Sequence, residues 1–131
     1  MKTRIFLLTI VLGAAMLLLG QETFGPGTYK GEWHGATASG AIHITFRGDR
    51  TGGLTPEIGF TLGDQDVVCK VLSFKTDGMK FRLVYEFDAQ GTLLQSATDA
   101  TVKGKTIEGA YKTTAGDQDV DSGTWKATLA P

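Results

Sequence analysis

From residue 27 onward, short stretches of alternating apolar and polar residues are separated by glycine. All 18 glycines except Gly13 and Gly20 lie beyond residue 20, and no window there has helical periodicity. Period-two alternation bounded by turn residues predicts half-buried strands. Eight are expected, near 28–35, 40–47, 53–61, 67–75, 79–87, 92–101, 105–114 and 121–129. Residues 27–131 are therefore predicted to form one all-β domain, an antiparallel up-and-down barrel of about eight strands or, alternatively, a β-sandwich.

Residues 1–20 have a different pattern, because Lys2 and Arg4 precede an apolar stretch from Ile5 to Leu19. This layout predicts a secretory signal peptide, cleaved between residues 20 and 25, and a secreted or periplasmic protein. An uncleaved signal segment is the one membrane contact that we expect. Of the 13 lysines and arginines, Lys2 and Arg4 lie in this segment, so 11 basic and 14 acidic residues remain, a net charge of −3. That charge gives nucleic acid no electrostatic attraction.

The apolar residues predict which residues pair across the strands in three hairpins. We expect Asp77-Gly78 to form a two-residue turn and the last hairpin to be centred on Gln118. The first register also places Glu32 opposite His43, and the second places Cys69 opposite Glu86. The expected inward pairs are Trp33 with Ile42, Gly31 with Ile44 and Tyr29 with Phe46; Phe74 with Phe81, Leu72 with Leu83 and Val68 with Phe87; and Tyr111 with Trp125, Ile107 with Leu129 and Gly109 with Ala127.

The segment GDQDV occurs twice, at 63–67 and 116–120, and the second copy continues as GDQDVDSG. Its alternating aspartates resemble the start of a calcium loop. A loop of the EF-hand type needs glycine at its sixth position and a bidentate acid at its twelfth. Counted from Asp117, these positions hold Ser122 and Thr128. We therefore interpret both copies as turns, formed by the residue types that turns favour.

Aromatic residues recur on the face that the alternation turns inward. A closed barrel of eight strands either fills its interior with side chains or holds one small ligand. The candidate ligand-binding residues are Tyr29, Trp33, Tyr85, Tyr111 and Trp125, with Phe46, Phe81 and Phe87 on the same inward face.

Catalytic and metal-binding constellations are not expected. The two histidines, His34 and His43, alternate onto the outward face, and no serine stands in a G-x-S-x-G elbow. Nucleophilic catalysis needs a base beside its nucleophile. Glu32 pairs with His43 in the expected register, which indicates a surface ion pair rather than a metal site. Cys69 is the only cysteine, so it has no internal disulfide partner, and we expect an inert thiol.

Two short motifs resemble those of known barrels. Gly31-Glu32-Trp33 resembles the G-x-W of lipocalin-like barrels, and Gly123-Thr124-Trp125 resembles the G-T-W of avidin-like barrels. Residues 27–129 are also similar in pattern to small secreted β-rich domains of bacteria, many of them uncharacterised. The shared pattern is G-x-W, a middle hairpin of the F-x-L-x-Y kind, and I-x-G-x-Y followed by G-T-W. This resemblance implies a barrel and an exported protein, and it carries no catalytic residue.

The sequence thus predicts an exported barrel that binds non-covalently either a small apolar ligand or a protein partner, with no cofactor and no metal. A ligand-free structural or inhibitory interaction module is the alternative, and an enzyme is the third hypothesis.

Overall fold

A computed structural model describes residues 24–131, which form one antiparallel sheet of nine strands. The expected signal peptide lies outside these residues. Within 24–131 no helix is long and apolar enough to cross a membrane. The strands are β1 (Gly27–Gly35), β2 (Ser39–Gly48), β3 (Leu54–Leu62), β4 (Gln65–Val68), β5 (Lys70–Asp77), β6 (Lys80–Ala89), β7 (Thr92–Lys103), β8 (Thr106–Ala115) and β9 (Gln118–Leu129).

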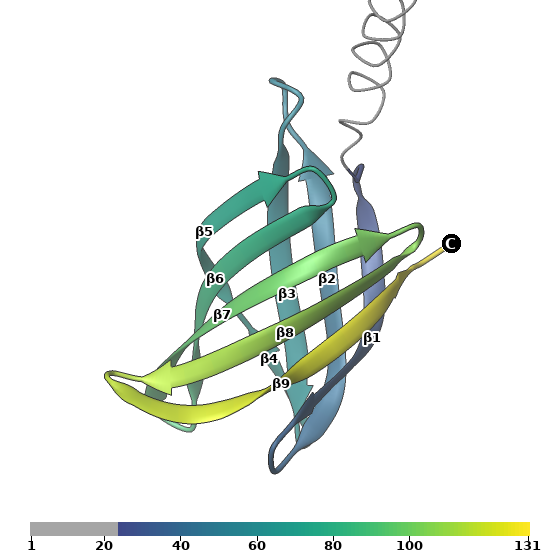
Figure 1. Cartoon of the computed structure of the whole chain (residues 1–131). Coiled ribbons are helices and arrows are strands. Elements are labelled where there is room, and N and C mark those ends of the chain that lie inside the picture. Colours follow the sequence, from purple (N-terminus) through teal and green to yellow (C-terminus); the bar gives the residue numbers. More distant parts are fainter. Residues whose placement is uncertain (1–23) are drawn as a thin grey trace, which may run out of the picture.

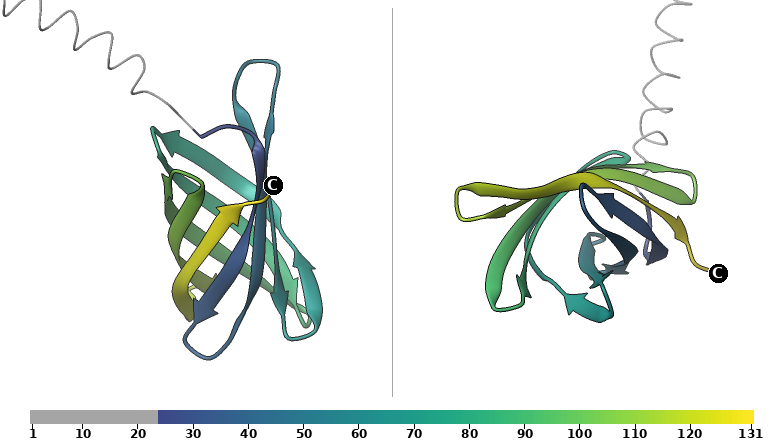
Figure 2. Two further views of the ribbon diagram at one scale, coloured as in Figure 1. Left: turned by 90° about the vertical axis from the view of Figure 1, so that its right-hand side faces the viewer. Right: turned by 90° about the horizontal axis from the view of Figure 1, so that it is seen from below.

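The sheet is strongly curled into a half-barrel (Figures 1 and 2). Its order is β4-β3-β2-β1-β9-β8-β7-β6-β5, so sequence neighbours pair up and down, and the first strand pairs with the last. This confirms the predicted all-β, up-and-down antiparallel fold, and a single sheet replaces the alternative of a two-sheet sandwich. The strand predicted at 67–75 is divided at Cys69 into β4 and β5, which are the two edges of the sheet.

Successive connections lie at opposite ends of an up-and-down sheet. We call the end with loops 36–38, 63–64, 90–91 and 116–117 the far end. The other end, which we call the terminal end, has loops 49–53, 78–79 and 104–105 together with both ends of the described chain (Figure 1). Both GDQDV copies therefore begin at the far end.

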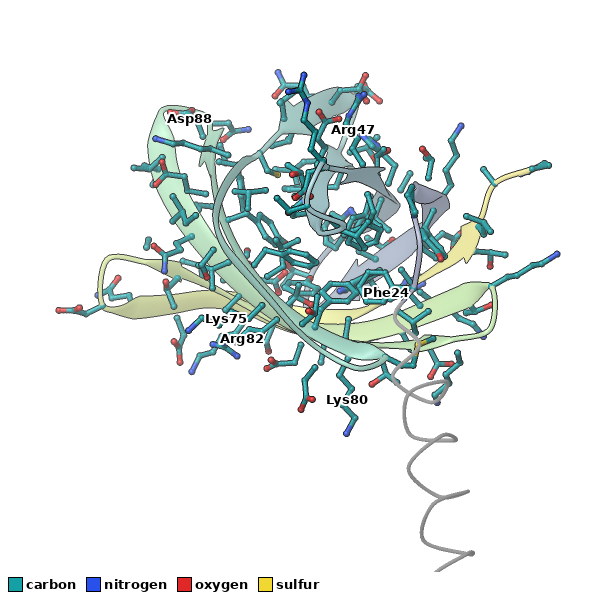
Figure 3. All side chains as sticks on the ribbon, turned by 90° about the horizontal axis from the view of Figure 1, so that it is seen from above. Phe24, Arg47, Lys75, Lys80, Arg82 and Asp88 are labelled. Atoms are coloured by element: carbon teal, nitrogen blue, oxygen red, sulfur yellow. The ribbon has the colours of Figure 1, made fainter. Side chains whose placement is uncertain are left out.

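Phe24 fills the interior at the terminal end. Its side chain is 5% exposed, and its ring centroid lies 4.8 Å from that of Phe46 and 5.5 Å from that of Phe81. Figure 3 shows Phe24 directed into the curl, whereas Lys80 and Arg82 point away from it. On that outer face, Arg82 Nη1 lies 2.8 Å from Asp99 Oδ2. The apolar interior and charged exterior are what the alternation predicts for strands with one buried face.

The first and last hairpins have the predicted faces, but their predicted registers are wrong by two positions. In the middle hairpin the predicted inward positions of Val68 and Leu72 are also wrong, because these side chains are 86% and 43% exposed. Trp33 lies opposite Gly40, Trp125 opposite Gly109 and Tyr111 opposite Gly123. A shift of two keeps each side chain on its face, because side chains alternate with period two. The observed partners that replace the predicted ones are Gly31 with Ile42, Tyr29 with Ile44 and Gly27 with Phe46; Thr76 with Phe81, Phe74 with Leu83 and Val68 with Gly59; and Ile107 with Ala127.

Glycine explains the shift in the first and last hairpins. A Cβ atom on Gly109 would overlap the indole of Trp125, and one on Gly40 would lie 2.7 Å from Trp33 Nε1. Each ring thus occupies the space that a side chain on the neighbouring strand would need. Matching large apolar residues across the strands, as the sequence prediction did, therefore gives the wrong partners.

Turns and bulges account for the remaining differences. The central turn residues are Gly78-Met79 rather than Asp77-Gly78, and Gly116-Asp117 rather than a loop centred on Gln118. Gly78 and Gly116 have φ of 63° and 60°, so glycine takes the first turn position, as in type II′ turns. Register shifts leave Leu72 and Val120 without a partner, and both are about half exposed, at 43% and 52%.

Candidate functional site

A cavity of about 200 Å³ opens to solvent at the far end of the half-barrel. Its lining is mostly aromatic and aliphatic, with a few hydroxyl groups and one carboxylate. The lining residues come from seven strands and the β1–β2 loop, and they are Trp33, Thr37, Ala38, Ile42, Phe60, Leu62, Tyr85, Phe87, Leu94, Ser96, Tyr111, Thr113, Val120, Asp121 and Trp125.

Aromatic rings of the cavity pack edge to face. The ring centroid of Trp33 lies 5.9 Å from that of Phe60 and 6.3 Å from that of Tyr111, with an interplanar angle of 81° in each pair. Phe60 in turn packs against Phe87, with centroids 4.9 Å apart. The indole N–H of Trp33 donates to the carbonyl of Thr61 at 3.0 Å. These contacts fix the rings in place before any ligand arrives.

The buried polar side chains around the cavity are already hydrogen-bonded to one another. Trp125 donates its indole N–H to Thr98 Oγ1 at 2.8 Å, and the hydroxyls of Ser96 and Thr113 share a hydrogen bond. Within the described chain, no buried side-chain nitrogen or oxygen lacks a partner. A ligand in the cavity would therefore meet few free polar groups, which favours an apolar ligand.

Asp121 is held at the cavity by two neutral donors. The hydroxyl of Tyr111 donates to Oδ2 at 2.8 Å, and the backbone N–H of Ala36 donates to Oδ1 at 3.0 Å. Burial, and next the hydrogen bond and charge of Asp121, raise the pKa of Tyr111. Tyr111 therefore remains a neutral donor well above physiological pH.

Four of the five candidate ligand-binding residues line this cavity: Trp33, Tyr85, Tyr111 and Trp125. Tyr29 does not. Its buried ring packs on Phe46, with centroids 6.0 Å apart, and its strand pairs it with Ile44. Strand β1 starts at the terminal end, so Tyr29 and Trp33 lie at different depths along it.

Sequence reasoning missed Phe60 and Asp121 as cavity residues. Phe60 lies on a strand for which no register was derived, although its alternation with Ile58 was available as a signal. Asp121 was considered only as one of the alternating aspartates that follow the second turn, at the start of the expected strand 121–129. A bulge at Val120, between Asp119 and Asp121, interrupts the regular pairing there.

Both histidines are exposed on the outer face, away from the cavity. The predicted pair of Glu32 with His43 is wrong, because Lys30 faces His43 in the ladder. Glu32 Oε2 instead lies 3.5 Å from His34 Nε2 on its own strand. Among residues 24–131, no group of three or more His, Cys, Asp or Glu side chains could hold a metal ion.

Cys69 is half-buried at the junction of β4 and β5, and burial raises the pKa of its thiol to about 12. The prediction that it faces Glu86 is wrong, because Lys70 occupies that position. A thiol held in its protonated form is a poor nucleophile.

The two GDQDV segments begin with turns, as predicted. Gly63 and Gly116 have φ of 62° and 60°, and each starts a two-residue connection at the far end. In the second copy, Asp119 forms an ion pair with Lys112, with 3.3 Å between Oδ2 and Nζ. Protein groups thus contact Asp119 and Asp121, two of the three alternating aspartates.

The chain matches none of the protein-family models, curated proteins or solved structures with which it was compared. Its function is therefore inferred from the geometry of the cavity.

Proposed function

We propose that this protein is an exported half-barrel that binds a small, mainly apolar ligand non-covalently at its far end. The observation that carries the proposal is the open cavity of about 200 Å³, walled by aromatic rings. Sites for small molecules are typically concave and mostly apolar, with a few polar groups that orient the ligand. Tyr111 and Asp121 supply such polar groups here.

The size of the cavity limits the ligand. Typical pockets for drug-sized ligands start at about 300 Å³, and this cavity is smaller. Phe24 and its aromatic neighbours occupy the terminal end, so the ligand would enter from the far end only part of the way along the interior. A molecule of one ring or a short branched chain fits this description better than a long acyl chain.

We also propose that the protein is related in pattern to lipocalin-like and avidin-like barrels. We propose that it is secreted into the periplasm or outside the cell. Trp33 of the G-x-W motif and Trp125 of the G-T-W motif both line the cavity. Their position supports the proposal that both tryptophans contact a bound ligand. The alternative function, a ligand-free interaction module, would leave the cavity unused.

A matched pair of variants tests the proposal. Leu94 lines the cavity, whereas Leu93 is 61% exposed and does not. Leu94→Trp should fill the cavity, and Leu93→Trp should leave it open. Toluene, indole and cyclohexanol would be titrated into ¹⁵N-labelled protein, and the amide shifts followed by NMR. We expect saturable shifts around Trp33 and Trp125 in the wild type and in Leu93→Trp, and their loss in Leu94→Trp.

The same experiment can reject the proposal. Wild-type protein that shows no saturable shift with any probe, and that carries no small molecule in native mass spectrometry after purification from its own host, would favour the interaction module instead.

A further inference from the structure

The described residues that line the cavity include one carboxylate, that of Asp121. Among residues 24–131, Asp121 is the only charged residue that lines the cavity, and no lysine, arginine or histidine of these residues does so. The charge that these residues place at the cavity wall is therefore negative. Such a charge disfavours anionic ligands and favours cationic ones.

The charge of Asp121 is positioned but not neutralised. Its two hydrogen-bond donors, the Tyr111 hydroxyl and the Ala36 N–H, are both neutral. In the part of the chain that the structure describes, no salt bridge involves Asp121. The nearby Lys112 pairs with Asp119 instead. A half-buried carboxylate without a counter-ion can gain a favourable partner from a cationic ligand.

The aromatic walls add a second source of cation binding. The faces of tryptophan, tyrosine and phenylalanine attract cations, tryptophan most strongly, and quaternary ammonium ligands are recognised in this way. Trp33 and Tyr111 both line the cavity, and Tyr111 also carries the hydrogen bond to Asp121. The carboxylate of Asp121 and the rings of Trp33 and Tyr111 therefore line the same cavity.

We propose that the ligand of this cavity is a small organic ammonium ion, whose charged head lies between Asp121 and the rings of Trp33 and Tyr111 and whose apolar part enters the cavity. This inference rests on the proposed ligand-binding function and names the ligand class. The same walls would accept a neutral molecule of equal shape less well, and an anion would meet the charge of Asp121.

Three probes of nearly the same shape separate charge from apolar fit. Choline, 3,3-dimethylbutan-1-ol and 3,3-dimethylbutanoate present a trimethylammonium group, a neutral tert-butyl group and a tert-butyl group on an anion, respectively. Each would be titrated into the folded protein by isothermal calorimetry and by NMR. We expect choline to bind about tenfold more tightly than the neutral alcohol and the anion to bind more weakly than either.

Two charge-neutralising variants locate the effect. Asp121→Asn should reduce the preference for choline over the neutral alcohol several-fold. Asp117→Asn removes the same charge from the same hairpin, at a residue that does not line the cavity, and should leave the preference unchanged. Thermal unfolding of each variant confirms that it is folded, and the wild-type ranking of the three probes tests the proposal even if Asp121→Asn does not fold.

The outcomes distinguish this inference from the proposed function. Equal or tighter binding of the neutral alcohol or the anion overturns the ammonium inference and leaves apolar binding intact. A preference for choline that survives in Asp121→Asn removes the role assigned to that carboxylate. No binding of these three probes, together with none of toluene, indole or cyclohexanol, overturns both proposals.

Discussion

Trp33 and Trp125 are direct partners across the ladder that joins the first strand to the last. Their side chains are 7% and 2% exposed. Each indole N–H reaches a different element, since Trp33 donates to Thr61 on β3 and Trp125 donates to Thr98 on β7. The two tryptophans thus connect the paired strands β1 and β9 to β3 on one side and to β7 on the other.

We therefore expect truncation of either tryptophan to be costly. Trp125→Ala should lower the free energy of unfolding by about 3–5 kcal/mol, as for large-to-small changes in a packed core, and Trp33→Ala by about 3 kcal/mol. Urea unfolding followed by circular dichroism measures both losses. The exposed Leu93→Ala is the control, with an expected change within about 0.5 kcal/mol. A loss below about 1 kcal/mol at Trp33 would mean that its ring serves the cavity and not the core.

The strands could be predicted from the sequence because alternation and glycine spacing are local signals. The registers of the first and last hairpins could not be predicted, because the deciding contacts are between a ring on one strand and a glycine on the next. Trp33 opposite Gly40 and Trp125 opposite Gly109 are examples. A sequence shows where the aromatic residues and the glycines are, but not which of them are direct partners across two strands.

Gly109 provides a test of this explanation. A methyl group at this position would overlap the indole of Trp125. Gly109→Ala should therefore destabilise the protein by about 1–3 kcal/mol, the usual cost of overpacking, although alanine is otherwise tolerated in strands. Gly25→Ala is the matched control, because a Cβ there meets no atom within 4 Å. Equal melting temperatures for the two variants would contradict the ring-over-glycine packing.

The candidate site was predictable in part for the same reasons. Alternation places Trp33, Tyr85 and Trp125 on the buried face whatever the register. Their burial therefore follows from their odd or even position along the strand. Whether a residue lines the far end or packs near the terminal end depends on its depth along the strand, which separates Trp33 from Tyr29. The place of Asp121 depends on the bulge at Val120, and no local signal predicts that bulge.

Phe24 precedes the predicted start of the domain, yet it is buried against Phe46 and Phe81. Phe24→Ala should lower the free energy of unfolding by about 3 kcal/mol or more, as for other buried phenylalanines. Signal cleavage that removed Phe24 would incur a similar loss. We therefore expect N-terminal sequencing of the exported form to begin at or before Phe24. A mature chain that starts after Phe24 and unfolds at the same urea concentration as a longer one would show that this ring is dispensable.

Cys69 should be unreactive in the folded protein. Burial raises the pKa of its thiol from 9.0 to about 12, so at pH 8 the folded protein carries about a thousandfold less thiolate than an ordinary thiol would. Titration with Ellman's reagent at pH 8 should give slow labelling, and the rate should rise sharply in denaturing urea. Fast labelling without urea would indicate that the junction of β4 and β5 opens readily.

Tyr111 should make the stability of the protein fall at alkaline pH. Burial and the Asp121 carboxylate raise the pKa of Tyr111 in the folded state above its ordinary value of 10.0. Between the two values the unfolded chain has released this proton while the folded chain still holds it. The unfolded state then binds fewer protons, so the free energy of unfolding decreases as pH rises above about 10. Cys69 and Tyr85, whose pKa values burial also raises, contribute in the same direction.

The variant Tyr111→Phe isolates the contribution of Tyr111 to the pH dependence of the free energy of unfolding. At pH 8 it should be less stable than the wild type by about 0.5–1.5 kcal/mol, because the hydrogen bond to Asp121 is lost. The difference should shrink as pH rises above about 10, since phenylalanine has no proton to lose while the wild type is destabilised. Urea unfolding of both proteins at pH 8, 10 and 11 measures the difference, and the contributions of Cys69 and Tyr85 cancel in the comparison. A difference that stays constant over this range would mean that the Tyr111 hydroxyl ionises as it does in the unfolded chain.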